Sequence, residues 1–340
     1  MPFLLWFIAG LIVAAAGCHH TPSKPSDLPF VALPGGAAGI GFDDLVFDRV
    51  ARRILAPGGR TGRLYLVDPD SQSVTSVGGF AAQSDYDGSH DNGTTSADAG
   101  RGLVFAIDRT KGRLDVIDPG AGTIVAGAPL LSTPDYVRYV AATGEVWVTE
   151  LDQQQIEIFS LPSSGAPVPG SVSTIKVPGG PEALIVDGTR GRAYTNVFDG
   201  ATVAVDVATH AVAGRWPNGC GSSRGLALDE QRGFIFVACS EGKAAVLDAG
   251  TGMLLSTLSS GSGVDFISYS RELGHLYVPG SDSATMAVLA VSTAGKLSLI
   301  GTVGTTQGSH CVVADDRGRA FICDPDRGQL LLYTDTLQGR

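Results

Sequence analysis

The feature that most constrains this chain is a four-strand pattern that recurs at a spacing of about 40 to 50 residues. Residues 181–216 carry a clear copy, with the runs ALIV, RAYTNV, TVAVDV and AVAGRW separated by turns that hold Gly, Asp or Thr. Short β-branched or aromatic runs between such turns are typical of antiparallel strands. One such sheet with an apolar face is not stable alone, so successive copies must pack on one another.

Seven copies are found when the residue that closes the first turn of each copy is taken as its mark. The marks are Arg53, Gly102, Gly144, Gly191, Gly233, Gly274 and Gly318. Four short strands at this period are typical of a β-propeller blade. The sequence therefore predicts an all-β fold, a seven-bladed β-propeller of four-stranded antiparallel blades. Because neighbouring blades share a continuous core, we expect residues 30–340 to form a single domain.

The two ends of this region complement each other. Residues 30–36, FVALPGG, resemble residues 174–180, TIKVPGG, where the last strand of one copy leads into the next. The seventh copy stops short of a fourth strand. We therefore expect the N-terminal strand to complete the last blade, which would remove open sheet edges. The alternative is that both ends are frayed.

Residues 1–17 form an uncharged apolar run that ends in small residues. The run is short for a membrane span, which favours a signal peptide. The sequence AAGC at 15–18 resembles the lipobox of bacterial lipoproteins, and the resemblance implies lipidation of Cys18. Residues 18–29 would then be a polar tether. This interpretation places the protein in the periplasm or on the cell surface, as an outer-membrane lipoprotein held to the membrane only by lipid; a signal peptide cleaved without lipidation is the alternative.

The charge balance limits the partners. The net charge is −10, only 17% of residues are charged, and no cluster of Lys and Arg is present. Nucleic acids and anionic membrane surfaces need a basic patch, so neither is expected as a partner. We expect a monomer that binds a small molecule or a protein.

Four cysteines follow Cys18, and an even number in an exported chain favours disulfides. Cys311 and Cys323 lie symmetrically about the first turn of the seventh copy, and Cys220 and Cys239 flank the corresponding hairpin of the fifth. The predicted bonds are Cys220–Cys239 and Cys311–Cys323. A thiolate metal site is the alternative, but no C-x-x-C spacing is present.

The starts of the first strands would line the central channel of the propeller. Aligned on the marks, these positions are Asp43, Gly93, Asp135, Glu182, Arg224, Asp265 and His310. The loops after the second strands open on the same face and add Asp108, Glu150 and Asp324. The insertion at 84–95 brings His90 and several aspartates to the same rim. These residues together predict an acidic, ligand-binding funnel.

Two interpretations of the funnel remain open. In the first, Asp43, Asp135, Glu182 and Asp265 hold Ca²⁺ or another divalent cation, which prefers oxygen ligands, or they bind a cationic ligand. A bound metal could polarise a carbonyl for hydrolysis, with His310 carrying the proton. In the second, Arg224 pairs with Glu182 and Asp265 and the ring is structural. No nucleophile with its base is visible, so the sequence does not decide whether the protein is an enzyme.

The repeat resembles the YVTN-type repeat of the YncE-like propeller family. The resemblance covers residues 30–340 and is carried by SADAGRGLVFAIDRTKGRLDVIDPGAGTIV, IVDGTRGRAYTNVFDGATVAVDVATHAV and ALDEQRGFIFVACSEGKAAVLDAGTGMLL. It implies a binding platform with varied partners, which is the leading interpretation. Glu182 after Gly180-Pro181, with the ring acids, is similar to gluconolactonase-like propellers, which have six blades and a channel metal. That resemblance implies the alternative, a divalent-metal-dependent lactonase.

Overall fold

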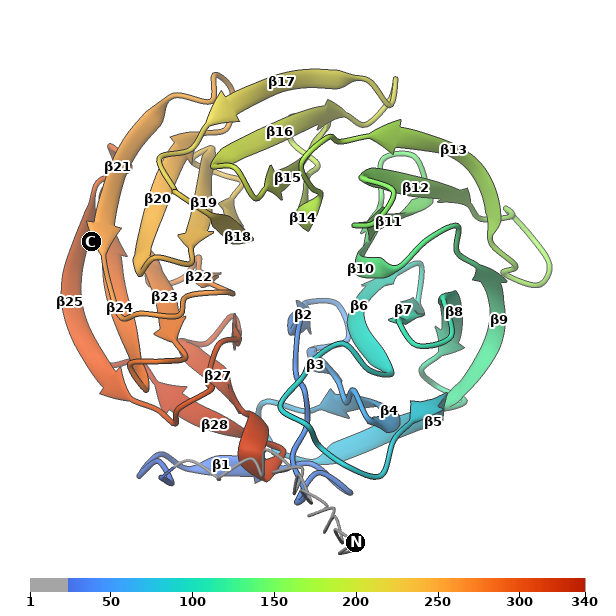
Figure 1. Cartoon of the computed structure of the whole chain (residues 1–340), viewed down its shortest axis with the longest axis horizontal. Helices are drawn as coiled ribbons and strands as arrows, with labels where there is room; N and C mark the ends of the chain where they lie inside the picture. Colours follow the sequence, from blue (N-terminus) through green and yellow to red (C-terminus); the bar gives the residue numbers. More distant parts are fainter. Residues whose placement is uncertain (1–23, 340) are drawn as a thin grey trace, which may run out of the picture.

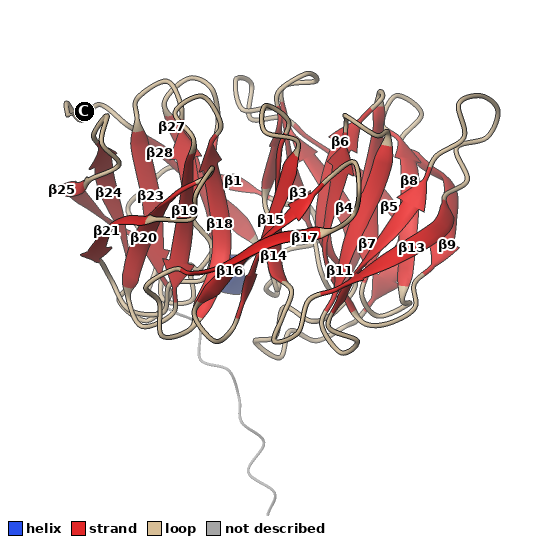
Figure 2. Ribbon diagram, turned by 90° about the horizontal axis from the view of Figure 1, so that it is seen from above, coloured by secondary structure: helices blue, strands red, loops and turns tan. Residues whose placement is uncertain are grey.

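The computed structural model describes residues 24–339, so the expected signal peptide, Cys18 and the first part of the tether lie outside the described residues. The described chain forms seven four-stranded antiparallel sheets that surround a central channel (Figure 1). The prediction of an all-β, seven-bladed propeller is therefore confirmed. Seen from the side, the strands run between two faces that carry the loops (Figure 2).

Each of the first four blades uses four consecutive strands, the first beside the channel and the last at the rim. Blade one contains β2 (Val46–Asp48), β3 (Arg53–Pro57), β4 (Thr61–Val67) and β5 (Val74–Ala82). Blade two contains β6 (Thr94–Gly100), β7 (Leu103–Asp108), β8 (Arg113–Asp118) and β9 (Thr123–Pro129). Blade three contains β10 (Pro134–Val140), β11 (Glu145–Glu150), β12 (Gln155–Ser160) and β13 (Gly170–Lys176). Blade four contains β14 (Glu182–Asp187), β15 (Arg192–Val197), β16 (Ala201–Asp206) and β17 (Val212–Pro217).

The remaining blades follow the same plan until the chain ends. Blade five contains β18 (Ser223–Asp229), β19 (Phe234–Cys239), β20 (Lys243–Asp248) and β21 (Leu254–Ser259). Blade six contains β22 (Ser268–Ser270), β23 (His275–Gly280), β24 (Thr285–Val291) and β25 (Leu297–Gly304). Blade seven contains β26 (Val312–Ala314), β27 (Arg319–Asp324), β28 (Gln329–Thr334) and β1 (Phe30–Ala32), with the 3-10 helix η1 (Pro325–Arg327) before β28. No helix within residues 24–339 is long and apolar enough to cross a membrane.

The N-terminal strand closes the ring, as predicted. β1 pairs with β28, and Val31 lies opposite Leu330. The described part of the predicted tether also contacts the propeller. Ser26 donates a hydrogen bond to the carbonyl of Gly304 over 3.1 Å, and Leu28 packs against the core shared by blades six and seven.

The residue that closes the first turn of each blade has a left-handed backbone conformation with positive φ. This observation corrects the mark that the sequence analysis assigned to blade one. Gly102 has φ of 74°, and the other glycine marks have similar values. In blade one the left-handed residue is Arg52, with φ of 53°, while Arg53 already belongs to β3. The sequence alignment of blade one was therefore wrong by one residue, because an arginine takes the conformation that glycine adopts more easily.

The core lies between the blades, where apolar faces of neighbouring sheets meet. The largest fully buried side chains include Trp147, Tyr65, Tyr194 and Tyr277. The outermost strands have more exposed residues, whereas the middle strands β7, β15 and β23 are almost wholly buried. This packing fixes the inner strands around the channel and positions the residues at their ends.

Candidate functional site

A cavity of about 680 Å³ occupies the end of the channel where the inner strands begin. We call it the acidic cavity. Seven of the ten predicted ligand-binding residues line it: Asp43, His90, Asp135, Glu182, Arg224, Asp265 and His310. They come together because each blade contributes the start of its inner strand to one ring, and because the 84–95 insertion covers that ring. Tyr136 lies at the inner end, with its ring centroid 5.7 Å from that of Phe266.

Blade two departs from this pattern, and sequence alignment missed its contribution. At the aligned position, Gly93 lies so close to blade one that an added Cβ would be 2.1 Å from the Gly59 carbonyl oxygen. Arg109, just after β7, supplies the side chain instead. Its guanidinium lies 2.8 Å from Asp135 and 3.1 Å from Asp91. Its position after the second strand was a usable signal, but the prediction took the preceding residue, Asp108.

Asp108, Glu150 and Asp324 do not line the acidic cavity, so their predicted place in the funnel is corrected. All three side chains are fully buried. Asp108 accepts hydrogen bonds from the amides of Ala81 and Lys111, and Glu150 accepts one from the amide of Ser132. Gln155 and Gln329 donate to Glu150 and Asp324, respectively. These carboxylates end the second strands and hold neighbouring loops, which satisfies buried amides.

Asp43 is the most unusual acid of the ring. It is 4% exposed, and its Oδ2 has no hydrogen-bond partner within residues 24–339. The nearest opposite charge is His90, whose Nδ1 lies 3.8 Å from Asp43 Oδ1. Burial raises the pKa of Asp43 although His90 opposes this shift. Asp43 in turn raises the pKa of His90 to about 10, so this histidine is a cation at neutral pH.

The other buried acids hold protons more tightly than usual. Burial raises the pKa of Asp135 to about 7, and the nearby charge of Asp43 adds to the shift while Arg109 opposes it. Burial likewise raises the pKa of Glu182 well above its usual range, with further contributions from Asp135 and Asp265. Arg224 opposes this shift from 3.6 Å, which is the distance of its ion pair with Glu182. Of the ring acids, Asp135 is therefore the one expected to exchange a proton near neutral pH.

The ring acids do not form a ready chelating set. Among the described residues, the one group of three metal-binding side chains with donor atoms within 4.8 Å of one another is His310, Cys311 and Cys323. These two cysteines are joined in a disulfide. The ring nitrogens of His310 also lie 2.7 Å from the Gly308 carbonyl oxygen and 2.9 Å from that of Phe42. Among residues 24–339, the predicted metal ligands Asp43, Asp135, Glu182 and Asp265 do not bring three carboxylate oxygens within 4.8 Å of one another.

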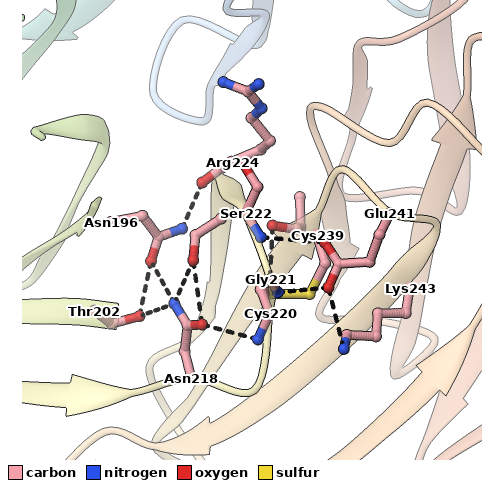
Figure 3. The surroundings of a disulfide bond; sticks show 12 residues. Asn196, Thr202, Asn218, Cys220, Gly221, Ser222, Arg224, Cys239, Glu241 and Lys243 are labelled. Carbon is pink, nitrogen blue, oxygen red and sulfur yellow. Dashed lines mark hydrogen bonds and ion pairs between the residues drawn. A yellow bond between two sulfur atoms is a disulfide. The ribbon is translucent and has the colours of Figure 1, made fainter. Parts of the chain in front are cut away.

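Both predicted disulfides are present, and both support the ring. Cys311–Cys323 fixes the residue next to His310. Cys220–Cys239 holds the loop that leads into β18, in which Arg224 is the second residue, and Figure 3 shows the Arg224 side chain pointing away from this bond. Asn218 stiffens the same loop by donating to Thr202 over 3.1 Å and by accepting from the amide of Cys220 over 3.1 Å. The disulfides therefore brace two blades on either side of Asp265.

Comparison with solved structures shows the fold. A chain in the crystal structure of the mitotic checkpoint complex has a TM-score of 0.73 at 12% identity, covering 98% of this chain and 99% of that chain. The β-propeller domain of Myceliophteria thermophila Cps50 (Swd1) has a TM-score of 0.70 at 11% identity, covering 93% and 100%. No protein-family model and no curated protein matches the chain. The resemblance to YncE-like propellers stays a prediction, and the chain is a seven-bladed β-propeller.

Proposed function

We propose that the protein is a non-catalytic binding platform whose acidic cavity takes an organic cation. The cation would be an ammonium or guanidinium group of a small molecule or of a partner protein. The observation that carries the proposal is the buried carboxylate of Asp43, which has one oxygen without a partner and belongs to the lining of a cavity. Such an oxygen costs free energy until a donor satisfies it.

The charge of the lining supports a cation over an anion or a neutral ligand. Three cations, Arg109, Arg224 and protonated His90, share the cavity with six carboxyl groups: Asp43, Asp91, Asp135, Glu182, Asp265 and Asp326. Arg109 already lies between Asp91 and Asp135, so the cavity accommodates a guanidinium group. Phe198 is a further lining residue, and its ring already carries the Arg224 guanidinium 5.2 Å from the ring centroid, so a cation fits against this aromatic face.

The shape of the ring favours an organic cation over a bare metal ion. The acids come from different blades and do not converge on one point, whereas an ammonium or guanidinium group has three to five donors that point outward. Such a group can satisfy separated carboxylates. Ca²⁺ binding by Asp43, Asp135, Glu182 and Asp265, and lactone hydrolysis at the same face, form the competing proposal.

The proposed cellular location and membrane anchoring of this platform rest on the sequence. We propose an exported YVTN-type propeller that is anchored through lipidated Cys18 at the outer membrane and acts as a monomer. A similar solved chain comes from a complex, which supports a protein as one class of partner. A protein partner would present a Lys or Arg side chain to the acidic cavity.

The test is calorimetric titration of the mature protein with agmatine, which carries both a guanidinium and an ammonium group, at pH 8 and low salt. We expect the Asp43→Asn and Asp265→Asn variants to bind agmatine about tenfold more weakly or worse, the loss typical of a charged hydrogen bond. Asp199→Asn is the matched control, because Asp199 lies near the same face, is 66% exposed and pairs only with Arg215.

Two results would overturn the proposal. Equal affinities in wild type, Asp43→Asn and Asp265→Asn would show that agmatine does not use the acidic cavity. Tight Ca²⁺ binding together with lactone turnover that a chelator abolishes would establish the metal-dependent lactonase instead.

A further inference from the structure

Arg224 is the arginine of the acidic cavity that the rest of the protein engages least. Besides its contact with the Phe198 ring, its guanidinium makes one ion pair within residues 24–339, with Glu182 at 3.6 Å. A charge-assisted hydrogen bond to a carboxylate would be shorter, about 2.7–2.9 Å. Arg109, by contrast, donates a hydrogen bond to Asp135 over 2.8 Å. Arg224 is partly exposed on the cavity wall, so a ligand can reach its donors.

Asp265 lies next to Arg224 in the wall of the acidic cavity. The amide of Gly225, the residue after Arg224, donates a hydrogen bond to the Asp265 carbonyl over 2.9 Å. An added Cβ on Gly225 would lie 2.8 Å from the same oxygen, so the two backbones pack closely at this point. Both side chains line the cavity, and within residues 24–339 no ion pair joins the Asp265 carboxylate to a cation. One wall of the cavity thus offers a guanidinium and a carboxylate from neighbouring segments.

This pair of charges is complementary to a free α-amino acid. Such a molecule carries a carboxylate and an ammonium group on one carbon atom, so its two charges are also neighbours. A guanidinium group can donate two parallel hydrogen bonds to a carboxylate, and a side-chain carboxylate accepts hydrogen bonds from an ammonium group. Arg224 and Asp265 together can therefore hold both charges of the amino-acid head.

A third contact is available across the channel. β18 and β2 lie on opposite sides of the channel (Figure 1), and Asp43 lies shortly before β2 in the chain. His90 lies near Oδ1 of Asp43, whereas Oδ2 is the oxygen without a partner within residues 24–339. The charge of Asp43 contributes to the raised pKa of Glu182, so the two walls are close enough to interact. A ligand that contacts both walls needs a second cation at the far end of a chain.

We propose that the acidic cavity binds a free basic α-amino acid, with its carboxylate on Arg224, its α-ammonium group on Asp265 and its side-chain cation on Asp43. Arginine and lysine have this arrangement of charges, and both are cations overall. The cavity volume of about 680 Å³ is within the range of about 300–1,000 Å³ for ligand pockets. This inference rests on the proposed function, because the side-chain cation is the organic cation of that proposal. It adds the class of the ligand and makes Arg224 the residue that selects amino acids over polyamines.

The test compares each amino acid with its decarboxylated form. Agmatine is arginine without the carboxylate, so the two compounds differ only in the group that Arg224 would bind. In calorimetric titrations of the mature protein at pH 8 and low salt, arginine should bind about tenfold more tightly than agmatine, the gain typical of a charged hydrogen bond. Lysine should bind more tightly than cadaverine, its decarboxylated form, by a similar factor. These comparisons use the wild type and need no variant.

Two variants assign the contacts. Arg224→Gln should bind arginine and agmatine with about equal affinity, because it removes the charge that holds the carboxylate. Arg215→Gln is the matched control and should keep the preference for arginine, because Arg215 is a similarly exposed arginine outside the lining that pairs with Asp199. Asp43→Asn should weaken arginine and agmatine by the same factor, because both carry the guanidinium group.

The outcomes separate this inference from the proposed function. Arginine that binds no more tightly than agmatine, or a preference for arginine that survives Arg224→Gln, would overturn the inference. Agmatine binding that still depends on Asp43 would then leave the proposed function intact. If neither arginine nor agmatine binds at millimolar concentration, both proposals are wrong.

Discussion

The two ends of the channel are built from the same seven inner strands but carry different chemistry. In β18, Arg224 faces the acidic cavity, and Leu226 and Leu228, further along the strand, line a second cavity of about 330 Å³ at the opposite end of the channel. Side chains two residues apart share a face, so one strand can present a charge at its start and apolar groups further on. A propeller can thus hold two unlike cavities on one axis by changing residues along its inner strands.

The ends also differ in how they are held together. Both disulfides lie beside the acidic cavity. At the opposite end, buried polar groups link blades one, two and three: Ser96 donates to Asp44 over 2.6 Å, and Arg138 pairs with the same carboxylate. Covalent bonds brace the charged end, whereas ion pairs with buried carboxylates, among them Asp44–Arg138, brace the opposite end.

The largest expected effect comes from breaking the Asp44–Arg138 ion pair. Arg138→Met leaves the buried carboxylate of Asp44 without its partner, which should lower the free energy of unfolding by about 3 to 5 kcal/mol. Arg224→Met at the charged end should cost about 1 kcal/mol or less, because Arg224 is 34% exposed. Urea unfolding of both variants measures the difference.

A double variant controls this experiment. Asp44→Leu combined with Arg138→Met removes both charges and should recover most of the lost stability. Similar losses for Arg138→Met and Arg224→Met would show that the two ends do not differ in this respect.

Removing one disulfide should have the next largest effect. Cys220→Ser with Cys239→Ser opens a loop with a sequence separation of 19 residues, which should lower the free energy of unfolding by about 3 kcal/mol. Because this loop leads into β18, in which Arg224 is the second residue, agmatine affinity should also fall. Unchanged agmatine affinity would mean that the disulfide does not support the charged end of the channel.

The smallest expected effect is a pH dependence confined to the acidic cavity. Asp135 has its pKa raised to about 7, so it holds a proton below that pH and attracts a cation only above it. Agmatine affinity should therefore rise about tenfold from pH 6 to pH 8, as the ionised fraction grows. His90 stays protonated across this range, because its pKa is raised to about 10. Titrations of wild type and Asp135→Asn with agmatine from pH 6 to pH 8 check the slope.

The same proton affects stability in the opposite direction. Because the folded pKa of Asp135 is raised from 3.8, its protonated form contributes stability at low pH, and that contribution is lost as the pH rises through about 7. The unfolding free energy of wild type should therefore fall toward pH 8 more steeply than that of Asp135→Asn. A parallel course for the two proteins would contradict the assignment.

The fold could be predicted because each blade has the same local sequence pattern of turn residues and apolar runs. Turn residues and apolar runs recur in every blade, and the surplus strand at residues 30–36 matched a missing one. Both disulfides followed from positions within single hairpins. The ring residues could be aligned because each lies at a fixed distance from a turn.

The parts that could not be predicted depend on where side chains reach in three dimensions. Arg109 enters the acidic cavity because its long side chain reaches the ring in blade two, where Gly93 packs against blade one and offers no side chain, and no repeat alignment shows this. Asp108, one residue earlier, points to backbone amides instead. The second cavity, at the opposite end of the channel, was missed because the leucines of β18 look like ordinary core residues in sequence, and only the ring geometry shows that they line it.

The pairing of β1 with β28 joins the first described strand of the chain to the last. During synthesis, residues 30–32 therefore have no strand to pair with until β28 has left the ribosome. A contact between such distant segments forms late and slowly, since loop closure must precede it. Until then both strands keep unpaired edges, and this interval is when the protein is most exposed to aggregation and proteolysis.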